Sequence, residues 1–402
     1  MAHLILFDNE TREHLLPLTY TRPVADLRIG ILTIREKWEQ VMGYPASFLT
    51  QDYLTEKFEM NYGEENYLIN GSLLPTSQMV RLIQQLDFSE AILLEGELLA
   101  TKLTGKQIEK LIKDEDFGDL SGLEAADTEI LKLRGVYDLF HLNEAALEAD
   151  FDLITKGRTS EPLSDTNRLI GPSNRLFIEP GANVECATIN TQKGPVYIGK
   201  DALVMEGTLI RGGLAMCEGA VLKMGAKVYG ATTLGPKCKV GGEVSNVVFQ
   251  AHSNKGHEGY LGNSVLGEWC NIGADTNCSN LKNTYEEVKL WNYPAERFVK
   301  TGLQFCGLIM GDHTKVGINT MFNTGTVVGV AANIFGPGFP RNFVPSFAWG
   351  GASGYSTYRT GKAFDMMERV MVRRKKDLTV QDRLILLRIY EDTAKHRRWE
   401  KG

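Results

Sequence analysis

Two histidines stand close together in one glycine-rich stretch of the chain. His252 and His257 lie within residues 250–262, which read QAHSNKGHEGYLG. Because the ordinary pKa of an imidazole is near neutrality, a histidine in a connecting segment is a candidate general base. The alternative is a solvent-facing side chain without a chemical role. The choice depends on the elements that position this stretch.

A six-residue repeat surrounds the two histidines. Stepping by six along the chain meets only apolar residues over eight positions: Ile198, Val204, Ile210, Met216, Leu222, Val228, Leu234 and Val240. A small residue mostly follows four positions after each, and the register resumes near residues 266 and 310. This period predicts short strands joined by turns, with one aliphatic side chain per strand pointing inward. The repeat breaks at residues 243–265 and 281–307, where we expect loops that leave the repeat.

The flanking segments have other patterns. Short apolar runs such as residues 3–7, 67–70 and 91–94 alternate with helical spacing at residues 33–42 and 77–86. This alternation predicts an α/β domain with a mostly parallel sheet at the N-terminus. Two helices are expected at the C-terminus, over residues 362–376 and 380–398. Thr379 and Asp382 resemble a capping box at the start of the second helix. We place the domains at residues 1–170, 171–350 and 351–402.

Composition excludes several classes of protein. Acidic residues outnumber basic ones before residue 175, and the net charge of −6 gives no basic surface for nucleic acid. The sequence has no long apolar stretch and no secretory signal, so we expect no membrane span. The six cysteines form no Cys-x-x-Cys pair, which disfavours a zinc site or a disulfide framework. We therefore expect a cytoplasmic protein with reduced thiols.

Several motifs resemble those of a known enzyme family. Residues 256–262 (GHEGYLG), 266–267 (LG) and 271–276 (NIGADT) are followed by Asn280. This run resembles, without a gap, the acetyltransferase site of the bifunctional N-acetylglucosamine-1-phosphate uridyltransferase/glucosamine-1-phosphate N-acetyltransferases. The opening LLPLTYTRP, at residues 15–23, resembles a variant group with a shortened N-terminal domain. The resemblance implies a nucleotidyltransferase-like α/β domain, a left-handed parallel β-helix of hexapeptide repeats and C-terminal helices.

The resemblance also implies roles for residues around the second histidine. His257 would take a proton from the sugar amine as it attacks acetyl-CoA. Asn280 would orient the amine or the acetyl group, and the Ala274 backbone N–H would stabilise the oxyanion. Tyr260 and Asn271 would contact an amino-sugar phosphate such as glucosamine 1-phosphate.

The sequence departs from the family at both sites. The family's Arg and Lys that grip the sugar phosphate have no counterpart in register, which leaves Lys255, with Arg211 and Lys227, as candidates. Ile318 replaces a serine that helps to bind acetyl-CoA.

In the N-terminal domain, residues 7–12 lack the family's glycine-rich loop, and Ser72 replaces the aspartate that holds magnesium. The candidates left to bind nucleotide phosphates are Arg12, Arg22, Arg28 and Lys37. Asp8 is the candidate ligand for Mg²⁺. With these departures we expect slow or absent activity with UTP.

The expected protein is therefore a homotrimeric sugar-phosphate acyltransferase that serves synthesis of UDP-N-acetylglucosamine or a related amino-sugar nucleotide. A non-catalytic or regulatory sugar-nucleotide-binding protein is the alternative. His252 and His257 also resemble two of the three zinc ligands of β-helical carbonic anhydrases. No histidine between His141 and His252 is available as the third, which makes that interpretation the weakest.

Overall fold

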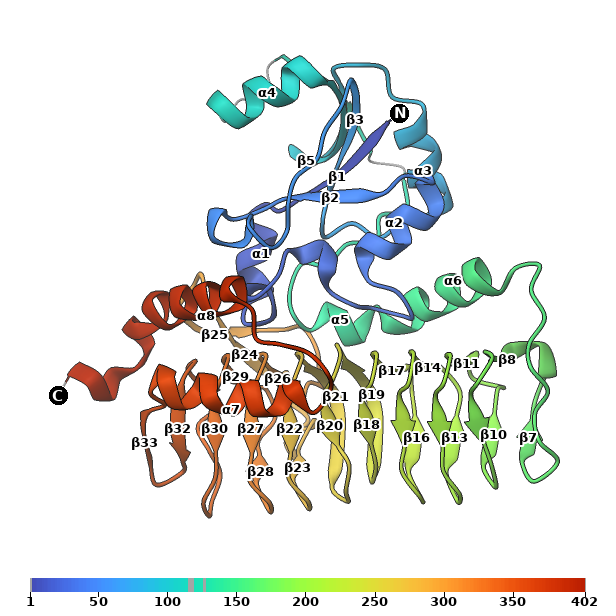
Figure 1. Ribbon diagram of the computed structural model, residues 1–402, viewed down its shortest axis with the longest axis vertical. Coiled ribbons are helices and arrows are strands. Elements are labelled where there is room, and N and C mark those ends of the chain that lie inside the picture. Colours follow the sequence, from blue (N-terminus) through green and yellow to red (C-terminus); the bar gives the residue numbers. More distant parts are fainter. Residues whose placement is uncertain (1, 115–118, 126–127, 402) are drawn as a thin grey trace. The chain divides into compact units, whose positions relative to one another are not determined.

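The computed structural model describes residues 2–114, 119–125 and 128–401 (Figure 1). The chain divides into two compact units. Unit 1 comprises Met1–Leu15, Thr21–Leu27 and Leu32–Arg134, and unit 2 comprises Leu16–Tyr20, Arg28–Ile31 and Gly135–Gly402. Two short segments from the N-terminal region therefore belong to the second unit.

Unit 1 is built on a six-stranded sheet in the order β2-β1-β3-β5-β4-β6. Its strands are β1 (His3–Phe7), β2 (Ala46–Leu49), β3 (Glu65–Asn70), β4 (Glu90–Leu94), β5 (Glu97–Thr104) and β6 (Ser121–Glu124). Strand β1 is parallel to β2 and β3, and β4 is parallel to β6, whereas β5 is antiparallel to both of its neighbours. The α/β prediction is confirmed, with a mixed sheet.

The helices of unit 1 are positioned by local sequence signals. They are α1 (Thr11–His14), α2 (Ile34–Met42), α3 (Ser77–Gln84) and α4 (Gly105–Asp114). Helix α2 begins with a capping box between Thr33 and Glu36 and ends at Gly43, whose φ of 75° is left-handed. The indole of Trp38 is fully buried and donates to the carbonyl of Leu73 at 2.8 Å. This packing fixes α2 next to the segment that follows β3.

Unit 2 is dominated by a parallel β-solenoid. Its strands are β7 (Arg168–Ile170), β8 (Leu176–Ile178), β9 (Asn183–Val184), β10 (Thr188–Asn190), β11 (Val196–Ile198), β12 (Leu203–Val204), β13 (Leu209–Arg211), β14 (Leu214–Met216), β15 (Val221–Leu222), β16 (Lys227–Tyr229), β17 (Thr232–Leu234), β18 (Lys239–Val240), β19 (Glu243–Phe249), β20 (Asn254–Lys255), β21 (Tyr260–Leu266), β22 (Asn271–Ile272), β23 (Asn277–Cys278), β26 (Leu308–Met310), β27 (Lys315–Val316), β28 (Met321–Phe322), β29 (Thr326–Val328), β30 (Asn333–Ile334), β31 (Phe343–Val344) and β32 (Ala348–Gly351). Successive turns pair in parallel and in register. The left-handed winding remains what the family resemblance implies.

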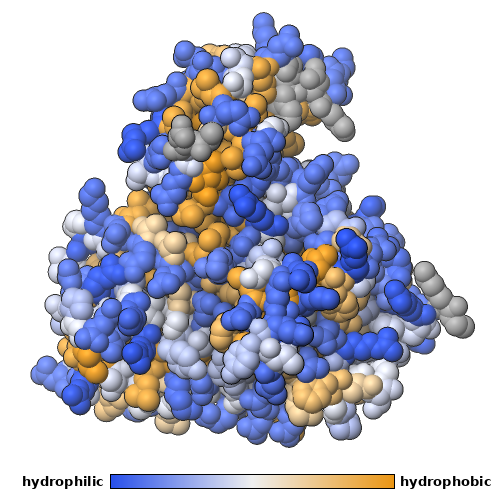
Figure 2. Space-filling view, turned by 180° about the vertical axis from the view of Figure 1, so that it is seen from behind, coloured by the Kyte–Doolittle hydropathy of each residue, from blue (hydrophilic) through white to orange (hydrophobic). Residues whose placement is uncertain are grey.

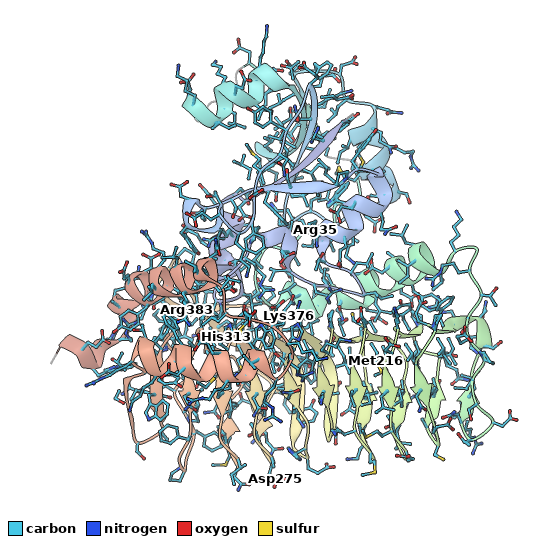
Figure 3. All side chains as sticks on the ribbon, in the orientation of Figure 1. Arg35, Met216, Asp275, His313, Lys376 and Arg383 are labelled. Carbon is cyan, nitrogen blue, oxygen red and sulfur yellow. The ribbon has the colours of Figure 1, made fainter. Side chains whose placement is uncertain are left out.

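The six-residue register forms the core of the solenoid. All eight apolar positions from Ile198 to Val240 are buried, with at most 3% of any of them exposed. Met216, labelled in Figure 3, is one of them. Outside this core, Figure 2 shows mainly hydrophilic side chains on the visible face. The periodicity therefore predicted the architecture correctly.

The two breaks in the repeat have different structures. The expected loop at residues 243–265 is wrong, because β19, β20 and β21 continue the solenoid there. Met216 pairs with Leu234, eighteen positions later, but Leu234 pairs with Phe249, only fifteen positions later. The shorter turn shifts the register without leaving the solenoid. At residues 281–307, by contrast, the chain forms a separate antiparallel hairpin of β24 (Lys289–Asn292) and β25 (Arg297–Lys300).

Helices flank the solenoid in sequence. Helices α5 (Asp138–His141) and α6 (Asn143–Thr155) precede it. After β33 (Gly354–Thr357), the C-terminal helices are α7 (Thr360–Val372) and α8 (Val380–Asp392). The predicted capping box of Thr379 and Asp382 is present, and Arg383 of α8 pairs with Glu368 of α7 (Figure 3). No helix in the described part of the chain is long and apolar enough to cross a membrane.

Candidate functional site

Asp8 follows β1 in unit 1, but its surroundings do not fit the expected magnesium ligand. One carboxylate oxygen accepts from the backbone N–H of Val24 at 2.9 Å, and the other accepts from the Thr50 hydroxyl at 2.6 Å. The Arg12 guanidinium lies 3.7 Å from the second oxygen. Burial raises the pKa of Asp8. Since both oxygens are engaged, and the described residues bring no three metal-binding side chains together, we assign no metal here.

A polar cluster lies near the carboxyl ends of β1 and β3. Glu97 accepts from the side-chain amides of Asn9 at 2.6 Å and Asn70 at 3.1 Å, and it also pairs with Lys132. Ser72 donates to the Asn70 side-chain oxygen at 2.7 Å. The sequence does not indicate that Asn9, Glu97 and Lys132 belong to one site, because only the pairing of distant strands brings these residues together. The carboxyl ends of parallel strands are where ligands of open α/β sheets bind.

The four cations expected at nucleotide phosphates are not gathered in this cluster. Arg12 is 7% exposed and donates to the Tyr53 hydroxyl at 2.5 Å. Arg22 and Lys37 are 6% and 3% exposed. Arg28 belongs to unit 2, where its backbone N–H donates to the Gln250 side chain at 2.6 Å. Folding buries Arg12, Arg22 and Lys37 and assigns Arg28 to the other unit, so contact of these four candidates with nucleotide phosphates stays a prediction.

A groove of about 1000 Å³ runs along the solenoid beside helix α7, and we call it the α7 groove. It is lined by Lys223, Lys239, His252, Asn254, Gly256, His257, Trp269, Cys270, Asn271, Ile272, Gly273, Ala274, Lys315, Ile318, Met366, Val370, Arg373 and Arg374. Figure 1 shows α7 running past successive turns of the solenoid. The groove thus contains three of the predicted site residues, namely His257, Asn271 and Ala274.

The α7 groove is strongly basic. Its lining contains five lysines and arginines and no carboxylate. Burial, followed by the nearby positive charges of Arg374, Lys223 and Arg373, lowers the pKa of Lys239. Burial lowers the pKa of Lys315 to about 8. Cations that lower one another's pKa favour a bound anion, so the groove is suited to a ligand with several negative charges.

A buried lysine stabilises the backbone of the bend that carries His257. His257 lies between β20 and β21 with its side chain exposed. The ammonium of Lys255, which is 1% exposed, donates to the carbonyls of His257 and Gly241, at 2.9 Å each. Burial lowers the pKa of Lys255 to about 8. Lys255 therefore supports the backbone beneath His257, and the expectation that it binds the sugar phosphate is corrected.

Tyr260 and Asn280 form a second group, outside the lining of the α7 groove. The Asn280 amide donates to the Tyr260 hydroxyl at 3.0 Å and to the Asn263 side chain at 2.8 Å. A Cβ at Gly262 would lie 2.3 Å from that hydroxyl, so glycine is needed for this close approach. Asn263 lines another cavity, of about 1100 Å³, together with Lys227 and other residues. The structure therefore separates the five predicted acetyl-transfer residues into two groups.

His252 contacts an aromatic ring that the sequence spacing did not reveal. Its imidazole stacks on Trp269 with ring centres 4.1 Å apart, and Trp269 stacks on His313 at 6.3 Å. All three residues have left-handed φ values between 54° and 60°. Burial lowers the pKa of His252, which favours the neutral imidazole. This stack forms one wall of the α7 groove through His252 and Trp269.

Comparisons with known proteins agree with the two-part architecture. Residues 4–159 match the sugar nucleotidyl transferase family. A bifunctional sugar-1-phosphate nucleotidylyltransferase/acetyltransferase from Sulfurisphaera tokodaii is 34% identical over 145 residues, 36% of each chain. The bifunctional protein GlmU of Methanocaldococcus jannaschii is 34% identical over 87 residues, 22% of this chain and 21% of the relative. The bifunctional protein GlmU of Methanococcus aeolicus is 33% identical over 87 residues, which are 22% of this chain and 20% of the relative.

These alignments span about a third or less of the relatives' own length. The names of these relatives combine the two activities that the family resemblance implies. The chain is therefore similar to the sugar nucleotidyl transferase family over residues 4–159 and, over part of its length, to bifunctional GlmU-like proteins.

Proposed function

We propose that the solenoid transfers an acetyl group from acetyl-CoA to the amine of a sugar phosphate, with the CoA lying in the α7 groove. The observation that carries this proposal is a groove with five cations, no carboxylate and an exposed histidine in its lining. The phosphates of CoA supply the anionic charge that such a groove favours. The relative from Sulfurisphaera tokodaii bears an acetyltransferase name, which supports the same activity.

The proposed reaction is an acyl transfer with His257 as general base. The sugar amine attacks the thioester carbonyl carbon, a C–N bond forms, and the C–S bond breaks to release CoA. The proton lost by the nitrogen goes to the imidazole of His257. The backbone N–H of Ala274, which also lines the groove, is the proposed donor to the developing oxyanion. The Tyr260–Asn280 group is proposed to contact the acceptor sugar, in keeping with the family resemblance.

For unit 1 we propose binding of a sugar-1-phosphate or its nucleotide at the cluster of Asn9, Glu97 and Lys132. The match of residues 4–159 to sugar nucleotidyl transferases supports this assignment. The departures at Ser72 and in the opening loop support slow nucleotidyl transfer. A regulatory, non-catalytic role of unit 1 is the alternative, favoured by the engagement of both Asp8 oxygens.

We further propose a homotrimer that works in the cytoplasm on amino-sugar nucleotide synthesis. The β-solenoid supports the trimer through the family resemblance. The six cysteines are unpaired, and five of them are buried, which supports a reducing compartment.

The test of acetyl transfer is release of free thiol from acetyl-CoA with a panel of amino-sugar phosphates. Arg373→Ala should raise the KM for acetyl-CoA by about tenfold, because a charge-assisted contact to phosphate is lost. Arg369→Ala is the matched control, since Arg369 lies one turn before Arg373, in α7, with an exposed side chain outside the groove lining. Absence of thiol release with every acceptor would refute the activity. Equal changes in both variants would refute the placement of CoA.

A further inference from the structure

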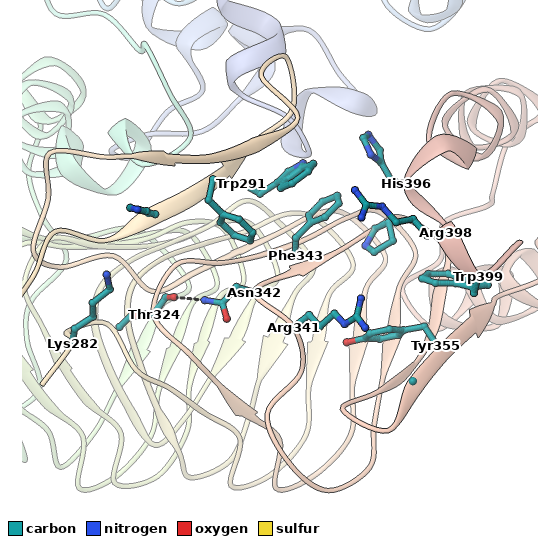
Figure 4. A pocket seen from close by; sticks show the side chains of 14 residues that line it. Lys282, Trp291, Thr324, Arg341, Asn342, Phe343, Tyr355, His396, Arg398 and Trp399 are labelled. Atoms are coloured by element: carbon teal, nitrogen blue, oxygen red, sulfur yellow. Dashed lines mark hydrogen bonds between the residues drawn. The ribbon is translucent and has the colours of Figure 1, made fainter. Parts of the chain in front are cut away.

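A third cavity of unit 2 lies away from the α7 groove, and we call it the aromatic pocket. It has a volume of about 1080 Å³ (Figure 4). The hairpin β24–β25, the segment around β31 and the last residues of the chain build it, through Trp291, Arg341, Phe343, Tyr355, Arg398 and Trp399 among others. None of its lining residues lines the α7 groove. The proposed acetyl transfer does not use it.

Flat side chains form one part of the wall. Trp291 stacks on Phe343 with ring centres 4.2 Å apart and planes 10° apart. Tyr355 and Trp399 form a second stacked pair at 5.7 Å. The ring of His396 packs edge-on against Phe343 at 5.5 Å, and burial lowers its pKa. The wall therefore offers aromatic faces and edges on which another flat ring can stack.

Basic side chains form another part of the wall, namely Lys282, Lys289, Arg341 and Arg398. Figure 4 shows Arg341 beside Tyr355, and Arg398 between His396 and Trp399. Both arginine side chains are exposed, and within the described residues neither makes an ion pair. The lining holds no carboxylate. Because neither guanidinium is paired with a carboxylate, the charge of each is available to an anionic ligand.

We propose that the aromatic pocket binds a nucleoside diphosphate. The base stacks on the aromatic wall. A simple phosphate ion has no ring and would make no use of that wall. The diphosphate meets Arg341 and Arg398, which an uncharged aromatic ligand would leave without a partner. This site lies in unit 2, and it is additional to the polar cluster of unit 1 and to the α7 groove.

Isothermal titration of the full-length protein with ADP and UDP tests this inference. Both nucleotides should bind, and adenosine and pyrophosphate should each bind at least about tenfold more weakly, because each lacks one half of the recognised chemistry. Arg341→Ala and Arg398→Ala should each weaken ADP binding by about tenfold or more. Arg297→Ala is the control, because Arg297 is an exposed arginine on the β24–β25 hairpin and lies outside the lining.

Two further variants separate this site from the others. Trp291→Leu should weaken ADP binding by about fivefold or more, whereas Trp291→Phe, which keeps an aromatic ring, should retain most of the affinity. Arg373→Ala in the α7 groove should leave ADP binding unchanged, so failure here is distinguishable from failure of the acetyl-transfer proposal. The inference is overturned if ADP and UDP do not bind. It is equally overturned if Arg341→Ala and Arg398→Ala bind them like the unsubstituted protein, or if CoA binds at this pocket and neither nucleotide does.

Discussion

His257 combines an exposed imidazole with a backbone fixed from below by Lys255. Such an arrangement fixes the position of an imidazole without burying it, so a proton that the ring accepts can leave to solvent. The family resemblance grouped His257 with Asn271 and Ala274, and the structure places all three in the lining of the α7 groove. The sequence was not sufficient to place Lys255, because a lysine close to a candidate base gives no sign that folding will bury its ammonium.

The first prediction concerns His257 itself. His257→Ala should lower kcat for acetyl transfer by about 10²–10⁴-fold, the usual contribution of a positioned general base. The fold should persist, because the side chain is exposed. Circular dichroism and thiol-release rates measure the two effects. His14→Ala, at an exposed histidine of unit 1, is the control, and it should keep full activity. Unchanged turnover of His257→Ala would exclude the proposed base.

The second prediction concerns pH and Lys255, whose pKa is lowered from its usual 10.5 to about 8. Between pH 8 and 10.5 the unfolded chain binds more protons at this group than the folded protein does. The free energy of unfolding should therefore gain a positive slope with pH in that window. Lys255→Met should lose this contribution. Urea denaturation of both proteins at pH 7, 8.5 and 10 measures it, and parallel profiles would contradict the assigned burial effect.

At the scale of elements, the solenoid depends on close contact between successive turns. The hexad register predicted which side chains face inward, from Ile198 to Val240. It did not predict the fifteen-residue turn between Leu234 and Phe249, because a shortened turn breaks the period that identifies the repeat. As a result, a continuous part of the solenoid looked like a loop in the sequence. The hairpin at residues 289–300 also looked like a loop in the sequence. Only the pairing of distant strands distinguishes this hairpin from the continuous solenoid at residues 243–265.

The third prediction tests the contact at the shortened turn. A Cβ at Gly235 would lie 1.7 Å from the Gln250 carbonyl oxygen, so Gly235→Ala must displace backbone. We expect a loss of at least about 1–3 kcal/mol in the free energy of unfolding, the usual cost of overpacking. Gly256→Ala, at a solenoid glycine with no atom within 4 Å of the added carbon, should be close to neutral. Thermal unfolding compares the two, and equal stability would contradict the tight stacking.

At the scale of the whole molecule, the chain joins an α/β unit, which matches the sugar nucleotidyl transferase family over residues 4–159, to a solenoid with separate cavities. The fourth prediction is that pyrophosphate release from UTP and N-acetylglucosamine-1-phosphate, with magnesium, is slow or absent. Ser72 stands where the family has an acidic residue, and it donates to Asn70. Ready pyrophosphate release would refute this. In that case Lys132→Ala would test whether the cluster around Glu97 binds the substrate.

The assignment of residues 28–31 to unit 2 has a consequence for synthesis on the ribosome. The carbonyl of Gly30 accepts from the Thr233 hydroxyl at 2.8 Å, and the Arg28 backbone N–H donates to Gln250, 222 positions later. The ribosome adds about 5–20 residues per second, so Thr233 and Gln250 are synthesised roughly 10–45 s after residue 28. Over that interval the backbone of residues 28–30 lacks these native hydrogen-bond partners. A fragment that ends at residue 134 would lack these partners permanently and should fold less stably than the full chain, although it contains every strand of its own sheet.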